Sequence, residues 1–267
     1  MLDEILTHKR AEVAERIARV PRAALAERAH TAPPARDFRA ALSRPGVSII
    51  AEIKRQSPAK GALRLDMDAP TMARTYAAAG AAAISVLTDE RYFNGSDADL
   101  VAVRQAVDVP ILRKDFVVDP YQVYEARTLG ADAILLIVRA LNRNEIVELS
   151  ALADSLGMAA LVEAHTAEEV AVALDAGATL VGINNRDLTR MVVDVATTER
   201  LRPLVPSGVT LVSESGIRSA DDIARLRTIG VDAALVGEAL VTAPDAGELL
   251  RSLIAAGRSP AEASAPR

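Results

Sequence analysis

Cysteine and tryptophan are absent from this sequence of 267 residues, and histidine occurs only three times. Without cysteine, the chain has no disulfide, no thiolate metal ligand and no cysteine nucleophile. His8, His30 and His165 are far apart in the sequence, so a histidine-rich metal site is not expected. We therefore predict that the protein binds no metal.

Long apolar runs and an excess of positive charge are also lacking. No apolar run reaches the roughly 18 residues that span a bilayer. The formal net charge of −5 does not suit nucleic acid or an anionic membrane surface as the main partner. The N-terminal residues MLDEILTHKR carry charge from the third position, unlike a secretory signal. We expect a cytoplasmic protein that binds neither nucleic acid nor membranes.

A repeated pattern of apolar run, polar loop and helix fills most of the chain. Gly80, Gly130, Gly177 and Gly230 each end a helical pattern and precede an apolar run. Glycine at this position can take a positive φ and let the chain leave the helix. The repeat predicts eight strands, at residues 47–54, 82–87, 110–113, 132–138, 158–163, 179–184, 209–214 and 232–237.

A helical pattern follows each predicted strand, at residues 68–79, 97–106, 120–129, 142–156, 166–176, 197–204, 219–228 and 245–256. Eight alternating units match a single (β/α)₈ TIM barrel of the α/β class. A doubly wound open sheet is the alternative, but it has no reason to stop at eight units. The first strand is also not followed by the GxGxxG of dinucleotide-binding sheets.

The chain before the barrel is expected to be helical. Residues 2–19 form an amphipathic pattern that ends before Pro21, and a looser segment follows. We divide the chain into an N-terminal helical extension (1–46), the barrel (47–257) and a disordered tail (258–267).

Only four of the 31 basic residues are lysine, and two of them, Lys54 and Lys114, end apolar strands. A buried amine can titrate, whereas a guanidinium cannot. These lysines are therefore candidates for proton transfer. The alternative is that both belong to buried ion pairs.

Polar side chains recur at the carboxyl ends of the predicted strands, where the active site of such a barrel lies. Alternation along the strands directs a common set inward: Glu52, Lys54, Lys114, Glu163, Asn184, Arg186 and Glu214. A single charged residue at a strand end is usually solvated. Two amines and three carboxylates at matching positions instead predict a site in which pKa values perturb one another.

Two loops have the composition of a phosphate site. Ser215 and Gly216 follow the seventh strand, and Gly237 and Glu238 follow the eighth. The loops after these strands commonly bind phosphate in this fold, through backbone N–H groups that glycine leaves accessible. Ser57, after the first strand, can add a hydroxyl. These residues predict a phosphorylated small-molecule substrate.

Two of the three phenylalanines, Phe93 and Phe116, follow the second and third strands. Their position predicts a flat aromatic substrate group stacked between them, with ordinary loop packing as the alternative.

Several blocks in order resemble the indole-3-glycerol-phosphate synthase family: ILTHKRAEV, AEIKRQSPAKG, VLTDERYFNGS, ILRKDF, LVEAHT, GINNRDL, SESGI and LVGEAL. Ala59 and Ala164 depart from the family pattern, which often has serine and valine there. The resemblance implies a barrel with a helical extension over its mouth and no cofactor or metal. We also expect a monomer. The implied reaction closes the ring of 1-(2-carboxyphenylamino)-1-deoxyribulose 5-phosphate, with loss of CO₂ and water.

The resemblance also implies roles for the candidate residues. Lys114 is the expected general acid, and Lys54 pairs with the substrate carboxylate and later donates a proton to the departing hydroxide. Glu163 and Glu52 are both candidates for the base. Asn184 and Arg186 are expected to orient the substrate, and Glu214 with Ser215 to complete the wall that binds the sugar. Phe93 and Phe116 are expected to pack against the aromatic ring, and the phosphate is expected to bind to Ser57, Gly216, Gly237 and the backbone of Glu238.

Two other functions stay open at this point. One is a different phosphosugar reaction on the same fold, by a Schiff-base aldolase with Lys114 as nucleophile or by an isomerase. The other is an inactive barrel that serves as a scaffold, although retaining buried charges without a function would cost stability.

Overall fold

The structure is a computed structural model that describes residues 1–186 and 192–258. The predicted disordered tail, apart from Arg258, lies outside the described residues. Eight strands occupy the predicted positions: β1 (Ser48–Ile53), β4 (Ala83–Leu87), β5 (Ile111–Lys114), β6 (Ala133–Ile137), β7 (Ala159–Ala164), β8 (Leu180–Asn184), β9 (Thr210–Glu214) and β10 (Ala233–Val236).

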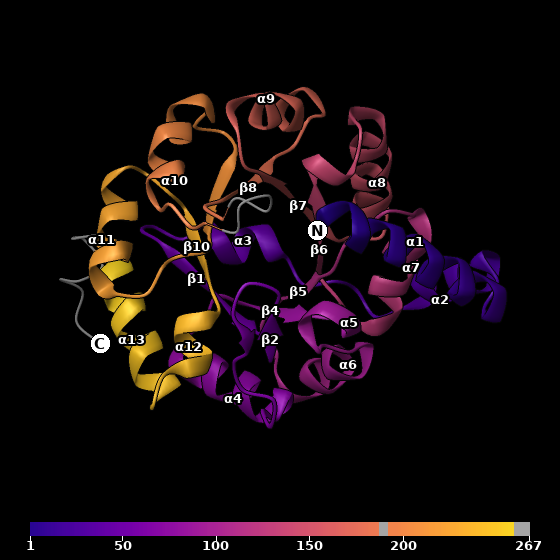
Figure 1. Cartoon of the computed structure of the whole chain (residues 1–267), viewed down its shortest axis with the longest axis horizontal. Helices are drawn as coiled ribbons and strands as arrows, with labels where there is room; N and C mark the ends of the chain where they lie inside the picture. Colours follow the sequence, from indigo (N-terminus) through magenta and orange to yellow (C-terminus); the bar gives the residue numbers. More distant parts are fainter. Residues whose placement is uncertain (187–191, 259–267) are drawn as a thin grey trace.

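These strands form a closed parallel barrel in the order β1-β10-β9-β8-β7-β6-β5-β4 (Figure 1). Ile50 of β1 is in register with Leu235 of β10 on one side and with Ala83 of β4 on the other. Because the first strand pairs with both the second and the last, the sheet has no open edge. The predicted (β/α)₈ barrel is confirmed, and the open sheet is excluded.

Helices surround the barrel, and each predicted one is present: α4 (Ala69–Ala79), α6 (Asp97–Ala106), α7 (Pro120–Leu129), α8 (Arg143–Ser155), α9 (Ala167–Asp175), α10 (Ala196–Leu201), α11 (Ala220–Thr228) and α13 (Ala246–Gly257). Gly80 and Gly130 follow α4 and α7 with φ of 99° and 93°. This left-handed conformation is the one that favours glycine, as predicted.

The interior of the barrel is filled by apolar side chains, so the barrel is a packed core and not a pore. Ile50, Leu112, Leu161 and Val212 are fully buried there, one on each odd-numbered strand in chain order. A second apolar cluster fills the layer between the strands and the surrounding helices. The strands are therefore apolar on both faces, and their polar residues gather at their ends.

Several elements were not predicted: α2 (Arg22–Thr31), α5 (Glu90–Phe93), α12 (Glu238–Thr242), the 3₁₀ helix η1 (Val138–Ala140), and the hairpin of β2 (Gln56–Ser57) and β3 (Gly61–Ala62). Most are too short for a periodic pattern to be visible. Helix α2 is longer, but it buries only Leu25 and Ala29, so its sequence has no clear apolar stripe.

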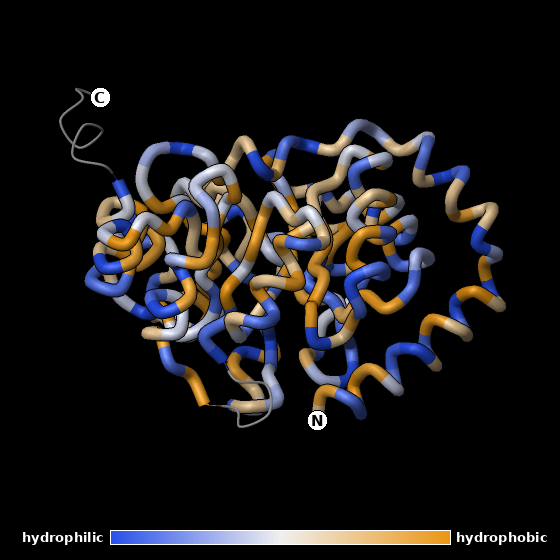
Figure 2. Tube along the Cα trace, turned by 90° about the horizontal axis from the view of Figure 1, so that it is seen from above, coloured by the Kyte–Doolittle hydropathy of each residue, from blue (hydrophilic) through white to orange (hydrophobic). Residues whose placement is uncertain are grey.

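The N-terminal extension reaches both ends of the barrel. It contains α1 (Leu2–Arg19), α2 and α3 (Phe38–Leu42). The start of α1 lies at the carboxyl ends of the strands, whereas Phe38 and Leu42 of α3 pack against Ala83 and Ala133 at their amino ends. Figure 2 shows the extension passing around the side of the barrel between these ends. Only its first helix therefore covers the mouth.

Helix α1 is attached to the barrel through a buried lysine. Lys9 is 1% exposed, and its Nζ lies 3.0 Å from carboxylate oxygens of Glu12, Asp89 and Asp115. Burial lowers the pKa of Lys9, but the three carboxylates raise it by more, so the amine stays charged. Asp115 directly follows β5, and Asp89 lies two residues beyond the end of β4, so this ion cluster joins α1 to strands that carry the predicted site.

We expect Lys9→Met to lower the free energy of unfolding by about 3 kcal/mol, because it leaves two buried carboxylates without their shared cation. Urea denaturation followed by circular dichroism measures this change. Arg19→Met on the same helix is the control, because Arg19 is 76% exposed and its ion pair is with exposed Glu15. If both variants unfold like the wild type, Lys9 does not attach α1.

Candidate active site

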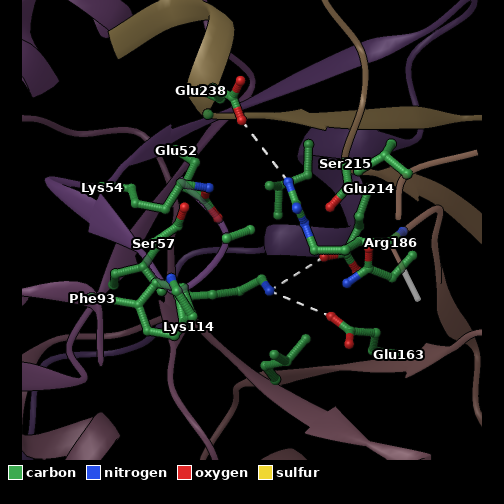
Figure 3. A pocket seen from close by; sticks show the side chains of 18 of the residues that line it. Glu52, Lys54, Ser57, Phe93, Lys114, Glu163, Arg186, Glu214, Ser215 and Glu238 are labelled. Atoms are coloured by element: carbon green, nitrogen blue, oxygen red, sulfur yellow. Dashed lines mark hydrogen bonds and ion pairs between the residues drawn. The ribbon is translucent and has the colours of Figure 1, made fainter. Parts of the chain in front are cut away.

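An open cavity lies at the carboxyl ends of the barrel strands, next to the start of α1 (Figure 3). It encloses about 1200 Å³ of empty space, including open solvent at the mouth. Every site residue predicted from the sequence lines it: Glu52, Lys54, Ser57, Phe93, Lys114, Phe116, Glu163, Asn184, Arg186, Glu214, Ser215, Gly216, Gly237 and Glu238.

Lys114, the last residue of β5, extends into the middle of this cavity. Its Nζ lies 3.4 Å from Glu163 Oε2 on β7 and 3.4 Å from Glu214 Oε2 on β9 (Figure 3). Burial lowers the pKa of Lys114, but Glu214, Glu163 and Glu52 together raise it above its ordinary value. The amine is therefore a charged ammonium that holds a proton in the cavity.

The two carboxyl groups next to Lys114 differ in protonation. Burial raises the pKa of Glu214 to about 7, and the nearby charges of Glu163 and Glu52 contribute, against the opposing effect of Lys114. Burial also acts on Glu163, but Lys114, His165 and a hydrogen bond from Asn184 bring its pKa below the ordinary value. Near neutral pH, Glu163 is charged and Glu214 is partly protonated, so the pair can take different chemical roles.

Two glycines provide room for these carboxylates. A Cβ on Gly182 of β8 would lie 2.2 Å from Glu214 Oε1, and a Cβ on Gly237 would lie 2.3 Å from Glu52 Oε1. A side chain at either glycine would therefore force the neighbouring carboxylate to move from its observed position. Gly237 was predicted for close approach to phosphate, and the position of Glu52 adds a second reason for glycine there.

The first strand contributes a second amine–carboxylate pair. Lys54 Nζ contacts Glu52 Oε1, and Glu52 is 3% exposed. Figure 3 shows both side chains on the side of the cavity opposite Glu163. The cavity thus has two amines on different strands, each next to a carboxylate.

Three cations surround the carboxylate of Glu238 at the other side of the mouth. Lys60, Arg186 and Arg218 lie 3.9, 3.9 and 3.5 Å from its oxygens. One carboxylate cannot balance three cations, so this region has excess positive charge. Sequence reasoning missed Lys60 and Arg218, although both follow strands in the loops already selected for phosphate.

The loop after β9 has an unusual backbone. Ser215 has φ of 68° and Gly216 has φ of 83°, so a serine occupies the left-handed region next to a glycine. The Asn185 side chain donates a 3.0 Å hydrogen bond to the Ser215 carbonyl and a 3.1 Å one to Ser213 Oγ. Such strain persists where surrounding contacts enforce it, often at functional sites. Asn185 was not predicted, and its buried position gives no signal in the sequence.

Phe93 and Phe116 form one apolar wall of the cavity. Their ring centroids are 6.1 Å apart and the rings are tilted by 40°. A third ring between two parallel rings needs about 7 Å, twice the usual 3.5 Å contact distance. The observed separation of 6.1 Å is shorter, so the two rings contact each other here, and the stacking of a substrate ring between them stays a prediction.

Within residues 1–186 and 192–258, no group of three or more His, Asp or Glu residues has the arrangement of a metal site. In the same part of the chain, no helix is long and apolar enough to cross a membrane.

The barrel and the acid–base groups at the carboxyl ends of its strands define an enzyme of the (β/α)₈ class. A family model described as indole-3-glycerol phosphate synthase matches residues 2–253. The chain belongs to the indole-3-glycerol phosphate synthase family.

Curated relatives of that name cover nearly the whole chain. The Roseiflexus sp. (strain RS-1) protein is 52% identical over 95% of this chain and 97% of its own length. The Streptomyces griseus protein is 51% identical over 98% of this chain and 97% of its own length.

Solved structures with lower identity share the fold alone. The 3-hexulose-6-phosphate synthase of Salmonella typhimurium has a TM-score of 0.64 at 13% identity, and it covers 79% of this chain and 98% of its own. The thiamine phosphate pyrophosphorylase of Pyrococcus furiosus has a TM-score of 0.60 at 19% identity, and it covers 79% of this chain and 95% of its own.

Glu214→Gln should stabilise the protein increasingly as pH rises. The pKa of Glu214 is about 7 in the folded state and ordinarily 4.5. Between these values the folded chain keeps a proton that the unfolded chain releases, so the wild type loses stability with rising pH. Glutamine does not titrate, so we expect the variant to gain about 2 kcal/mol relative to the wild type between pH 5 and pH 8.

Urea denaturation of both proteins at pH 5, 6, 7 and 8 measures this difference. Glu15→Gln is the control, because Glu15 is 71% exposed. A constant difference between Glu214→Gln and the wild type at all four pH values would contradict the raised pKa.

Proposed function

We propose that this chain acts as an indole-3-glycerol phosphate synthase and that Lys114 is its general acid. The substrate is 1-(2-carboxyphenylamino)-1-deoxyribulose 5-phosphate, and the products are indole-3-glycerol phosphate, CO₂ and water. The observation that carries the residue assignment is the partly buried Lys114 ammonium, 3.4 Å from both Glu163 and Glu214 in the cavity of a chain from this family.

Ring closure needs a proton donor at the ribulose carbonyl. The aromatic carbon that bears the carboxylate attacks the carbonyl carbon, and the electron pair of the C=O bond moves to oxygen. Lys114 donates its proton to that oxygen as the C–C bond forms. Its raised pKa keeps the proton available in the resting enzyme, and the developing alkoxide is far more basic than an amine.

Loss of CO₂ restores the aromatic ring, because the electrons of the broken C–C bond return to it. Lys54 pairs with the substrate carboxylate before this step, and the wall of Phe93 and Phe116 packs against the ring. The negative charge of Glu163 stabilises the positive charge on the substrate nitrogen after ring closure.

Dehydration completes the reaction. The hydroxyl leaves with a proton from Lys54, and a base removes a proton from the neighbouring ring carbon to form the indole double bond. We assign the base to Glu163, because it is charged and Glu52 is already paired with Lys54. Asn184, Arg186, Glu214 and Ser215 hold the sugar.

The excess positive charge at the mouth is assigned to the substrate phosphate. Ser57 and the backbone of Gly216, Gly237 and Glu238 donate hydrogen bonds, and Lys60 and Arg218 add charge. All these groups come from one chain, so a monomer suffices for the reaction.

Lys114→Ala should lower kcat at least a hundredfold, which is the typical size of one general-acid contribution. Indole fluorescence after addition of the anilino-ribulose phosphate measures turnover, and circular dichroism checks that the variant is folded. Near-normal turnover would remove Lys114 from the mechanism. Borohydride with substrate should give no adduct on Lys114, whereas a stable adduct would favour the Schiff-base aldolase.

Arg218→Met should raise KM about tenfold and leave kcat within about twofold, because it removes a charge that binds substrate and transition state alike. Steady-state kinetics with the same fluorescence assay separates the two constants. The control is Arg225→Met, an exposed residue that pairs with Glu199 away from the cavity. An unchanged KM in Arg218→Met would exclude Arg218 from the phosphate site.

A further inference from the structure

A buried imidazole lies next to the proposed base and has no role in the steps above. His165 follows Glu163 by two residues at the end of β7, and its side chain is 4% exposed. Its Nε2 lies 3.4 Å from Glu163 Oε1, the oxygen that does not face Lys114. Lys114 thus faces one oxygen of the Glu163 carboxylate, and His165 lies at ion-pair distance from the other, although Nε2 makes no hydrogen bond within the described residues.

The opposite edge of the imidazole is fixed by Glu169 of α9. Glu169 Oε2 lies 3.1 Å from His165 Nδ1 and also accepts a 2.7 Å hydrogen bond from the His165 backbone N–H. Arg139 of η1 donates to the other oxygen, Oε1, over 3.0 Å. Burial raises the pKa of Glu169, but both contacts with His165 and the charge of Arg139 lower it by more, so Glu169 is a carboxylate.

Two carboxylates facing the two ring nitrogens favour the doubly protonated ring. A neutral imidazole would donate Nδ1–H to Glu169 and turn the Nε2 lone pair toward an oxygen of Glu163, which is also an acceptor. The imidazolium instead donates Nδ1–H to Glu169 and turns a positively charged Nε2–H edge toward Glu163, at an ion-pair distance of 3.4 Å. Burial lowers the pKa of His165, and Arg139 also lowers it, but Glu169 and Glu163 raise it by more. These are the charged groups that face the ring from β7, α9 and η1.

We propose that His165 is a positioning residue of the reaction, which as an imidazolium fixes the Glu163 carboxylate in its ionised form and with Oε2 toward Lys114. The inference rests on the proposed function, in which Glu163 is the base. When the imidazolium loses its proton at higher pH, the ion pair with Glu163 is lost, and turnover falls. The decrease of kcat at alkaline pH then reflects the deprotonation of His165, and the charge of Glu169 determines the pH at which it occurs.

Substitution of Glu169 changes the charge on His165 without touching the cavity. Glu169→Gln keeps an amide oxygen for the His165 N–H but removes the negative charge, so the alkaline limb of kcat should move down by about one pH unit. The matched control is Glu145→Gln on α8. Glu145 also accepts from the backbone N–H of its helix cap, over 2.7 Å from Asn142, but faces no histidine. Its pH profile should match that of the wild type.

Substitutions of His165 itself distinguish a role in positioning Glu163 from a role in packing alone. His165→Leu should lower kcat about tenfold and leave KM within about twofold, because the base is misplaced while substrate contacts remain. His165→Gln should recover part of that loss, because its amide can donate to Glu163. Both variants should lack the alkaline limb seen in the wild type.

Nuclear magnetic resonance of the three imidazoles gives a readout that needs no substrate. The His165 signals, assigned with His165→Gln, should show a doubly protonated ring at pH 7, and Glu169→Gln should move its titration to lower pH. A neutral His165 at pH 7, or a wild-type pH profile in Glu169→Gln, would overturn the proposal. If the wild type forms no indole product at any pH, the proposed function fails, and so does the role of His165 that rests on it.

Discussion

The buried ion cluster of Lys114, Glu163 and Glu214 is the constraint on which the site depends. Charges inside a protein are costly unless each has a partner, and here one amine is the partner of two carboxyl groups. The unbalanced negative charge is avoided because Glu214, one of the two carboxyl groups, is partly protonated. The same arrangement leaves an acid and a base within the reach of one small molecule. The close placement of one amine and two carboxyl groups therefore causes both the electrostatic cost of the cluster and its capacity for proton transfer.

Strand β5 connects this cluster with the helical extension. Lys114 faces the cavity, whereas its neighbours Arg113 and Asp115 face outward, where Arg113 is 1% exposed and Asp115 contacts Lys9 of α1. Three successive charged residues can be placed in the barrel because alternation along the strand directs them into two different ion clusters. Displacing α1 would leave Asp115 without Lys9, immediately next to the proposed general acid. The extension is thus part of the electrostatic environment of the site as well as a cover for its mouth.

The sequence predicted the barrel because periodicity and helix-ending glycines repeat, and repeated signals are hard to produce by chance. It predicted the inward charges, such as Glu163, because strand alternation has a fixed period of two. It did not predict contacts that depend on the distance between separate loops. The direct contact of Phe93 with Phe116, the cations around Glu238 and the pairing of Lys9 arise only when the folded chain brings distant segments together.

The most direct test is the charge of Lys114 in the resting enzyme. The chain has four lysines, so protein labelled with ¹⁵N at lysine gives a simple side-chain spectrum, in which Lys114→Ala identifies the signal of Lys114. Because the neighbouring carboxylates raise its pKa above the ordinary 10.5, the amine should still be an ammonium at pH 10. A neutral amine at pH 8 would contradict the account, since Lys114 would then hold no proton to donate.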